Sequence, residues 1–277
     1  MSRSCRKKLA ILLDNEVLKK YNQLCGGDKV KVEITEKPDS KRTAGLCRLH
    51  KEAFGDSEEF VLKFMASSFF MAVAIATEDD EVIGAAYLVR PDSNEKVLYG
   101  YAVATLRSHR KKGVCREIHK SIFDLCDSEG YAYILHPATP ELCSFYKNLG
   151  LSPLSYTYEV EIEGDGGRYY DISADEYIAV RRMMLDGIGW NPEWIRLAGY
   201  KTVGFDIDGI SLAACISTNR IEEVLAPPHL EGAAARRAAS VLGRGRLLCF
   251  TDNPIGSSVA VMGYNANSYK YFNLFME

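Results

Sequence analysis

The chain has 277 residues, 47% of them hydrophobic and 26% charged, so it can bury a sizeable core, and its length is typical of two domains. Its net charge of −3 and isoelectric point near 6.0 argue against a nucleic-acid-binding protein, because such domains usually exceed about 9. The eight cysteines show neither a C-x-x-C pair nor a metal-ligand spacing. We therefore predict a cytoplasmic protein without a bound metal.

Residues 1–28 start with basic residues, which are followed by only five apolar ones, Leu9 to Leu13. A secretion signal needs an apolar region of roughly 7–15 residues, and a membrane span needs about 18. We predict a helical N-terminal extension over residues 1–28 and no association with a membrane.

Short apolar runs alternate with amphipathic segments between residues 29 and 163. In chain order the periodicities predict a strand at 29–37, helices at 40–54 and 57–70, a hairpin at 71–90, a strand at 96–104, a helix at 113–130, a strand at 131–137, a helix at 140–150 and a strand at 155–163. This order predicts an α/β fold, with a mixed α+β sheet that carries helices on both faces.

Basic residues are concentrated between the strand at 96–104 and the helix at 113–130. A loop that leads from a strand into a helix presents free backbone N–H groups, and the helix dipole favours negative charge there. Gly113 lets the backbone approach a ligand closely. The loop therefore indicates a site for a phosphate or a pyrophosphate.

The segment "VATLRSHRKKGVCREIHKSI" (103–122) resembles motif A of the GNAT superfamily of N-acetyltransferases, whose acetyl-CoA loop has the form Arg/Gln-x-x-Gly-x-Gly/Ala. Three positions depart from the usual pattern: Arg107 replaces a proline, His109 an aromatic residue and Cys115 the final small residue. Further on, "TPELCSFYKNLGL" resembles the family's next helix and places Tyr146 on its general-acid tyrosine. The resemblance covers about residues 29–163.

The resemblance implies a GNAT fold and an acetyl-CoA-dependent N-acetyltransferase that acetylates a primary amine of a small molecule or peptide by direct transfer. It also implies that Tyr146 protonates the leaving CoA thiolate. For the general base the sequence leaves open Glu95, and Tyr99 or Tyr101 acting through a water molecule. The residues expected to bind acetyl-CoA are Val103, Ala104, Thr105, Arg110, Lys111, Lys112, Gly113, Val114, Cys115 and Arg116.

The second half of the chain repeats this plan, since residues 191–217 line up with residues 57–89 and residues 245–264 echo the segment 131–151. We predict tandem GNAT-like folds: an acetyl-CoA-binding domain at 29–163 and a degenerate domain at 168–277. Aligning Gly232 on Gly113 puts Glu231 in place of Lys112, and a carboxylate repels a pyrophosphate. Val259 or Ala260 stands in place of the tyrosine, so we expect one acetyl-CoA per chain.

An alternative is a non-catalytic acyl-CoA-binding sensor or interaction module. A third function, nucleic-acid binding, is disfavoured because no second basic stripe accompanies the loop. The sequence leaves the acceptor amine and the oligomeric state open. It indicates that Trp190 and Trp194 pack in a core or an interface and that His119 has no special role.

Overall fold

The computed structural model describes residues 30–91, 96–185, 189–251 and 258–266, so the extension expected over 1–28 lies outside the described residues. Its strands are β1 (Lys31–Thr35), β2 (Phe70–Glu78), β3 (Glu81–Val89), β4 (Val97–Thr105), β5 (Ala132–Leu135), β6 (Ser152–Glu163), β7 (Tyr170–Asp171), β8 (Lys201–Ile207), β9 (Ile210–Ile216), β10 (Arg220–Leu225), β11 (Arg244–Thr251) and β12 (Ser258–Tyr264). Its helices are α2 (Ser40–Ala53), α3 (Glu58–Met65), α4 (Val114–Glu129), α5 (Pro140–Lys147), α6 (Ala174–Met184), α7 (Pro192–Leu197) and α8 (Glu231–Ala239), with a short 3-10 helix η1 (Arg107–His109).

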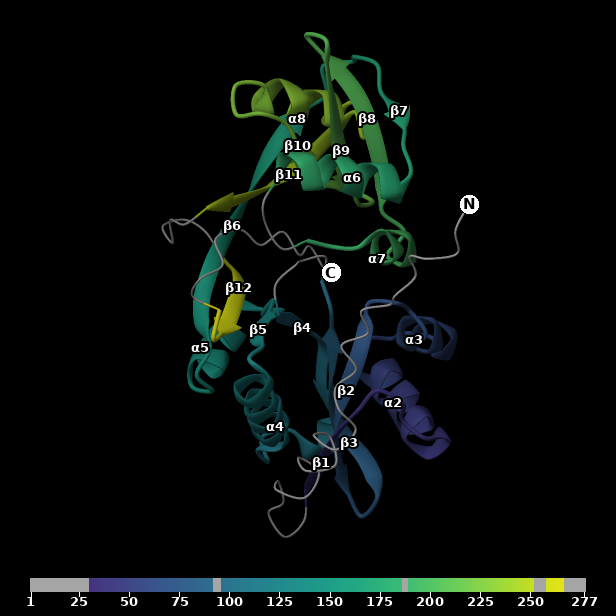
Figure 1. The fold of residues 1–277 in the computed structure, drawn as a ribbon, viewed down its shortest axis with the longest axis vertical. Helices are drawn as coiled ribbons and strands as arrows, with labels where there is room; N and C mark the ends of the chain where they lie inside the picture. The colour runs from purple at the N-terminus through teal and green to yellow at the C-terminus, as the bar shows by residue number, and fades with distance from the viewer. Residues whose placement is uncertain (1–29, 92–95, 186–188, 252–257, 267–277) are drawn as a thin grey trace, which may run out of the picture.

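The described strands form one mixed sheet in the order β1-β2-β3-β4-β5-β12-β6-β11-β10-β9-β8-β7. In the first half, β2 pairs antiparallel with β3, β3 antiparallel with β4, and β4 parallel with β5. Strands β8, β9, β10 and β11 pair in the same pattern in the second half. The two sets lie in opposite halves of the molecule (Figure 1). This arrangement confirms the mixed α/β sheet and the tandem plan expected from the sequence.

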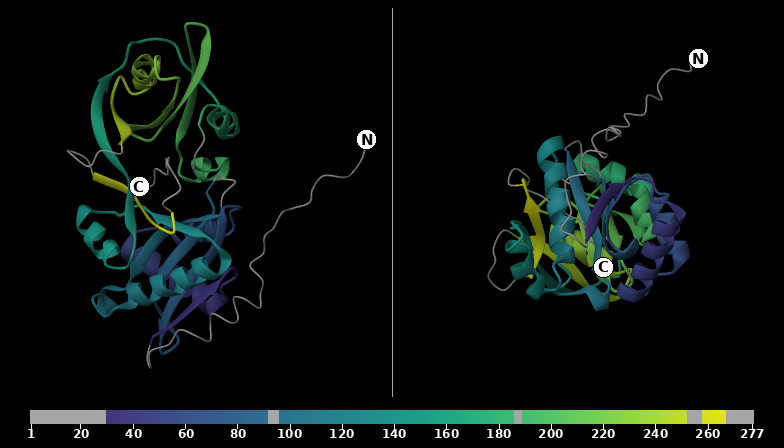
Figure 2. Two further views of the ribbon diagram at one scale, coloured as in Figure 1. Left: turned by 60° about the vertical axis from the view of Figure 1, so that its left-hand side comes forward. Right: turned by 90° about the horizontal axis from the view of Figure 1, so that it is seen from below.

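The two halves exchange strands at the middle of the sheet. Strand β12 comes from the second half but pairs with β5, while β6 follows α5 of the first half and pairs with β11 along most of its length. β6 and β12 also pair with each other. Figure 1 and Figure 2 show β6 running from one half into the other.

The division into domains at 29–163 and 168–277 stays a prediction, although the sheet continues across that boundary. One detail of the predicted repeat is wrong. Residues 258–264 form a strand, whereas the alignment with the Tyr146 helix would make them helical. Their partner is β5, far away in the sequence, and no local periodicity encodes such a pairing.

Helices cover both faces of the first half's sheet, which explains why β2 and β3 are almost continuously apolar. On one face, α4 buries Val114, Ile118 and Ile122 against the sheet. On the other face, α2 and α3 pack Leu46 and Phe64 against it. Burying one such side chain contributes about 1.5–3 kcal/mol.

The core on the α2 and α3 face extends into the second half. Its buried members include Trp190, Trp194 and Ile195, together with Tyr177 and Cys215 of the second half. Trp194 contacts Phe64 and Phe69 edge-to-face, with ring centroids 6.0 and 5.5 Å apart. Both tryptophans therefore pack where the halves meet, as the sequence indicated.

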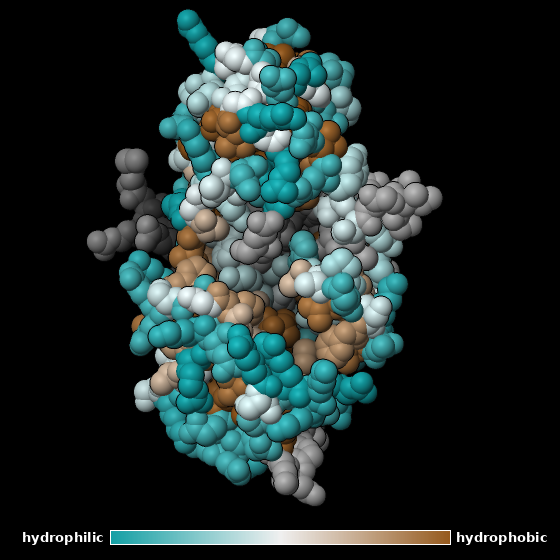
Figure 3. Space-filling view, turned by 180° about the vertical axis from the view of Figure 1, so that it is seen from behind, coloured by the Kyte–Doolittle hydropathy of each residue, from teal (hydrophilic) through white to brown (hydrophobic). Residues whose placement is uncertain are grey.

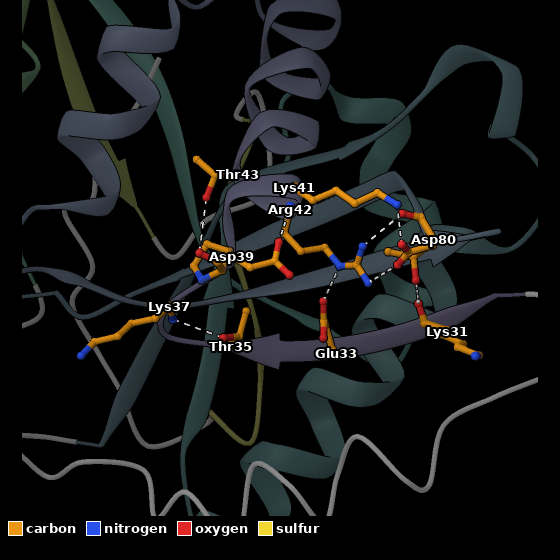
Figure 4. A network of polar contacts seen from close by, with 11 residues as sticks. Lys31, Glu33, Thr35, Lys37, Asp39, Lys41, Arg42, Thr43 and Asp80 are labelled. Atoms are coloured by element: carbon orange, nitrogen blue, oxygen red, sulfur yellow. Dashed lines mark hydrogen bonds and ion pairs between the residues drawn. The ribbon is translucent and has the colours of Figure 1, made fainter.

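Local polar contacts fix the edge strand and the start of α2 (Figure 4). Asp39 caps α2 by accepting a hydrogen bond from the backbone N–H of Arg42 at 2.7 Å. The Arg42 side chain reaches Glu33 on β1 at 2.8 Å and Asp80 in the β2–β3 turn at 2.7 Å. The two cations Lys41 and Arg42 lower the pKa of Asp80 to about 2.

Most predicted elements match the structure within a few residues. One predicted helix is too long, and one observed helix was missed. The second helix ends at Met65 instead of continuing to 70, since Phe70 already begins β2. Helix α6 was not predicted, although Ser173 and Glu176 form a capping box at its start. In the described part of the chain, no helix is both long and apolar enough to span a bilayer.

Candidate functional site

The sheet opens where β4 and β5 separate. Their parallel pairing runs from Val97 and Ala132 to Gly100 and Leu135, after which β5 ends while β4 continues to Thr105. Ala102 has a left-handed backbone, with φ of 49°, at an irregularity in the pairing of β3 and β4. The β4 backbone from residue 101 to residue 105 therefore has no partner in β5.

The separation exposes the segment that the sequence singled out. Val103 and Thr105 are half-buried and Ala104 is buried. Unpaired N–H and C=O groups on a strand edge accept an added extended chain, which is how a pantetheine arm would bind. The three residues predicted to contact the cofactor arm thus lie on the part of β4 that has no partner in β5.

The loop after β4 turns its backbone toward the start of α4. Lys111 and Gly113 both have left-handed φ angles, of 62° and 86°. At the start of the helix, the N–H groups of Arg116 and Glu117 donate to the Gly113 carbonyl, at 2.9 and 3.1 Å. Within the described residues, the N–H groups of 113–115 make no such bond.

Free N–H groups at a helix N-terminus form an anion site, and consecutive turns of this kind make an anion-binding concavity. A left-handed non-glycine residue costs roughly 1–2 kcal/mol, so the strain at Lys111 has to be compensated by the surrounding loop. The Lys111, Lys112 and Arg116 side chains are exposed around the helix start. The loop can therefore hold a diphosphate through its backbone and its cationic side chains together.

The residues that depart from the family pattern hold the loop in place. Arg107 donates its backbone N–H to Glu52 at the end of α2, at 2.8 Å. His109 Nε2 lies 3.1 Å from Glu78 at the end of β2. The Arg110 side chain turns back and donates to the Thr105 carbonyl at 3.2 Å. Arg110 thus fixes the loop to β4 in this structure, and its contact with a cofactor stays a prediction.

Tyr146 on α5 is buried beside the start of α4. Its ring centroid lies 5.5 Å from that of His119, and the nearby Cys115 thiol contributes to its electrostatic environment. Burial raises the pKa of Tyr146 above its ordinary value of 10, so the phenol keeps its proton at neutral pH. The side chain can therefore donate a hydrogen bond or a proton, but it cannot serve as a base.

His119 is fully buried and links Cys115 with Tyr133, so its surroundings are more specific than the sequence suggested. Its Nδ1 lies 2.8 Å from the Cys115 carbonyl, which can only accept, so Nδ1 carries the proton. Burial lowers the pKa of His119 to about 4 and raises that of the Cys115 thiol to about 12. Both groups are neutral at pH 7.

Glycine at position 100 makes this packing feasible. A Cβ atom there would lie 2.0 Å from the hydroxyl oxygen of Tyr133. The Tyr133 side chain crosses β4 at this point and brings its hydroxyl to 3.5 Å from His119 Nε2. A larger residue would push Tyr133 away and disturb the parallel pairs just before the opening.

The three residues left open as general base have different outcomes. Glu95 lies outside the described residues. Tyr99 is buried, and its hydroxyl accepts the backbone N–H of His136, while burial raises its pKa. Tyr101 is half-buried beside the opening, and burial together with Asp56 raises its pKa as well. Both phenols keep their protons at neutral pH, so neither tyrosine is itself a base, and a role through a water molecule stays a prediction.

A pocket of about 340 Å³ lies next to Tyr101, between α3, α7 and the turn that joins β9 to β10. Its aromatic and acidic lining residues are Phe60, Tyr101, Trp194, Tyr200, Asp56 and Glu222. Figure 3 shows hydrophobic patches scattered over both halves and near the waist between them, on a mainly hydrophilic surface. The sequence did not reveal this pocket, because its walls come from segments that are far apart in the chain.

The second half lacks the features of the first site. Gly232 lies inside α8, and no left-handed φ is found there, unlike at Gly113. Leu230 is buried at the start of α8, and Glu231 places a negative charge in its first turn. The alanines of α8 are buried against neighbouring strands. These observations agree with a degenerate second copy. In the described ranges, no group of His, Cys, Asp or Glu side chains could hold a metal ion.

Comparison with known proteins finds that residues 41–151 match the model of the acetyltransferase (GNAT) family. No curated protein matches the sequence. The fold is similar to that of a GCN5-related N-acetyltransferase from Kribbella flavida, at 12% identity and a TM-score of 0.60, over 87% of this chain and 72% of that one. A probable N-acyltransferase from Enterococcus faecalis has 11% identity and a TM-score of 0.63, over 84% and 72%.

A tandem GNAT protein from the clavulanic acid biosynthesis pathway is also similar, at 11% identity and a TM-score of 0.55. The match covers 84% of this chain and 98% of that one. At these identities the similarity concerns the fold, which is the GNAT fold with its mixed α/β sheet. The nearly complete coverage of a tandem protein agrees with the two strand sets that the sheet contains.

The burial of His119 predicts a specific pH dependence of stability. The unfolded chain protonates this histidine near pH 6.5, but the folded chain does so only near pH 4. Unfolding therefore takes up a proton between these values, and the free energy of unfolding falls as the pH drops from about 7 to about 4, by up to about 3 kcal/mol. In a His119→Gln variant the free energy of unfolding should fall less over this pH range, by that amount. Urea denaturation at several pH values measures the free energy of unfolding, with the exposed His229→Gln as control. If the free energy of unfolding fell equally with pH in the wild type and in His119→Gln, His119 would not have the lowered pKa.

Proposed function

Residues 41–151 form a domain of the acetyltransferase (GNAT) family, and on that premise we propose that the protein transfers an acetyl group from acetyl-CoA to a primary amine. The observation that supports the proposal is that two features follow each other directly along the chain. The unpaired β4 edge at 101–105 leads directly into the free N–H groups at the start of α4. An extended thioester arm and a diphosphate, joined as in acetyl-CoA, match this pair of features.

The donor is held in two parts. Val103, Ala104 and Thr105 offer backbone groups to the pantetheine arm. The amides of residues 111–115 and the charges of Lys111, Lys112 and Arg116 hold the diphosphate. Hydrogen bonds of this charge-assisted kind are about twice as strong as neutral ones. The thioester then lies where β4 and β5 separate, beside Tyr101 and Tyr146.

The transfer moves one acetyl group and one proton. The neutral amine attacks the thioester carbon, the C–S bond breaks, and the proton lost by the nitrogen balances the one gained by the CoA sulfur. A backbone N–H on the β4 edge stabilises the oxygen as it gains negative charge. Tyr146 donates to the leaving sulfur. Because its pKa is raised, the phenol acts first as a hydrogen-bond donor, and its proton is replaced after each turnover.

Direct transfer is favoured over a route through an acetylated cysteine. The Cys115 thiol affects the electrostatics of Tyr146, but burial raises the pKa of this thiol to about 12. Only the thiolate is nucleophilic. The neighbouring His119 cannot take the thiol proton through Nδ1, which already donates to the Cys115 carbonyl. Cys115 is therefore a poor acetyl carrier.

The diphosphate assignment predicts the effect of reversing two charges. Acetyl-CoA at about 100 times its Kd should stabilise the wild type by about 2.7 kcal/mol, by mass action. The double variant Lys111→Glu, Lys112→Glu should lose this stabilisation and remain folded, since both side chains are exposed. Thermal unfolding with and without acetyl-CoA measures the effect. The control variant Lys31→Glu, Lys51→Glu makes the same charge change elsewhere and should keep the stabilisation by acetyl-CoA. If acetyl-CoA stabilised the Lys111→Glu, Lys112→Glu variant as much as the wild type, the diphosphate would not bind at this loop.

The role of Tyr146 predicts a loss of turnover without a loss of donor binding. Tyr146→Phe keeps the ring and deletes the hydroxyl, so kcat should fall about 100-fold or more while the Kd of acetyl-CoA stays unchanged. A thiol-release assay and titration calorimetry measure the two quantities. Tyr131→Phe, another buried tyrosine, should leave both unchanged. Normal turnover of Tyr146→Phe would make this tyrosine a packing residue.

The other candidate is an acyl-CoA-binding sensor that does not turn over. The observation that favours it is that Tyr99 and Tyr101, the described candidates for the general base, keep their protons at neutral pH. The sensor hypothesis predicts that the protein binds acetyl-CoA but releases no CoA thiol with any amine. The protonated phenol of Tyr146, buried near His119 and Cys115 of α4, favours the enzyme.

A further inference from the structure

We propose that the pocket between the two halves binds a compact hydrophobic amine that carries no carboxylate, with its ammonium group on Asp56 and its apolar body between Tyr101, Trp194 and Tyr200. This inference rests on the proposed function, since it assigns the acceptor side of the same reaction. Four of its features carry the argument: position, size, charge and aromatic lining.

The position of the pocket suits an acceptor. Tyr101 lines it and directly precedes Ala102, where β4 has left β5. Tyr101 packs on the α3 side of the sheet, stacked on Phe64 with ring centroids 4.8 Å apart. Val114 and Ile118 of α4 pack on the opposite side. The donor loop and the pocket therefore lie on opposite sides of β4 and meet at the opening.

Asp56 is the carboxylate that gives the pocket its charge. It is about 29% exposed, and its Oδ2 lies 2.9 Å from His50 Nδ1. A carboxylate only accepts, so His50 donates from Nδ1 and fixes the orientation of Asp56. Burial lowers the pKa of His50, which is neutral at pH 7. The histidine thus positions the carboxylate without cancelling its charge.

The second carboxylate, Glu222, is already compensated. Arg220 binds it with two nitrogens, at 3.0 and 2.9 Å. Among the described residues, no Lys or Arg forms an ion pair with Asp56, and none lines the pocket. The pocket therefore attracts a cation, and its lining offers a ligand carboxylate no cationic partner, only neutral polar groups such as Ser217, Thr218 and Asn219. A simple amine fits this charge pattern better than an amino acid does.

The aromatic walls determine the rest of the ligand. Tyr101 and Trp194 contact each other with ring centroids 5.4 Å apart, and Tyr200 and Phe60 add further ring surface. Aromatic faces attract both apolar groups and cations, the latter within about 6 Å of a ring centroid. The volume of about 340 Å³ is at the lower end for small-molecule sites. One ring or a short aliphatic chain next to the ammonium group fits within it.

Tryptophan fluorescence tests the proposal without relying on turnover, because Trp194 lines the pocket and Trp190 is the chain's other tryptophan, 5.0 Å away between ring centroids. The probes are phenethylamine, 2-phenylethanol and phenylalanine, titrated into the full chain. Phenethylamine should give a saturable change and bind at least about 10-fold more tightly than the neutral alcohol and the amino acid.

Two variants locate the charge. Asp56→Asn keeps an acceptor for His50 and removes the negative charge, so the preference for phenethylamine over 2-phenylethanol should fall below about 3-fold. Glu58→Gln removes an exposed carboxylate two residues away and should keep the preference. The proposal is overturned by equal binding of amine and alcohol, by no saturable change with phenethylamine, or by a preference that persists in Asp56→Asn. Calorimetry with acetyl-CoA on the same samples separates the two ideas: if acetyl-CoA binds and the amine preference is absent, only the acceptor assignment fails.

Discussion

The separation of β4 from β5 is the constraint on which the rest of the site depends. The parallel pairing stops at Gly100 and Leu135, where β5 ends, and β4 continues alone through the left-handed backbone of Ala102. Unpaired backbone groups are costly unless a partner satisfies them. The opening therefore provides both the place and the driving force for an extended ligand. The loop at 106–113 and the start of α4 follow directly from the direction in which β4 leaves.

The exchange of β6 and β12 between the halves joins them in one sheet. Because each strand pairs with the sheet of the opposite half, the halves share one hydrophobic core that includes Trp190 and Trp194. A single chain thereby brings α7 and the turn before β10 next to Tyr101. Unlike the start of α4, the start of α8 has no left-handed glycine, since Gly232 lies inside the helix, and the second half supplies α7 and β10 residues to the pocket. The two sets of strands thus have similar pairing, but different residues stand at the corresponding loop.

Local signals accounted for much of the fold and of the donor site. Ser57 caps α3 and Gly130 ends α4 in a left-handed conformation, as their residue types indicate. The loop around Gly113 was found because its chemistry lies in consecutive residues. The bend at Ala102 had no signature, since alanine does not favour a positive φ. Pairing of β12 with β5 and of His50 with Asp56 depends on the tertiary fold, which periodicity does not encode. Helix α6 could have been found from its capping box at Ser173 and Glu176.

The central claim is that one chain contains a single donor site, formed by 103–116 in the first half. Isothermal titration calorimetry with acetyl-CoA on the intact chain tests it most directly, because stoichiometry does not depend on knowing the acceptor. The account predicts one acetyl-CoA per chain. A stoichiometry near two would show that the start of α8, with Leu230 buried and Glu231 in its first turn, binds a second molecule and would contradict the account.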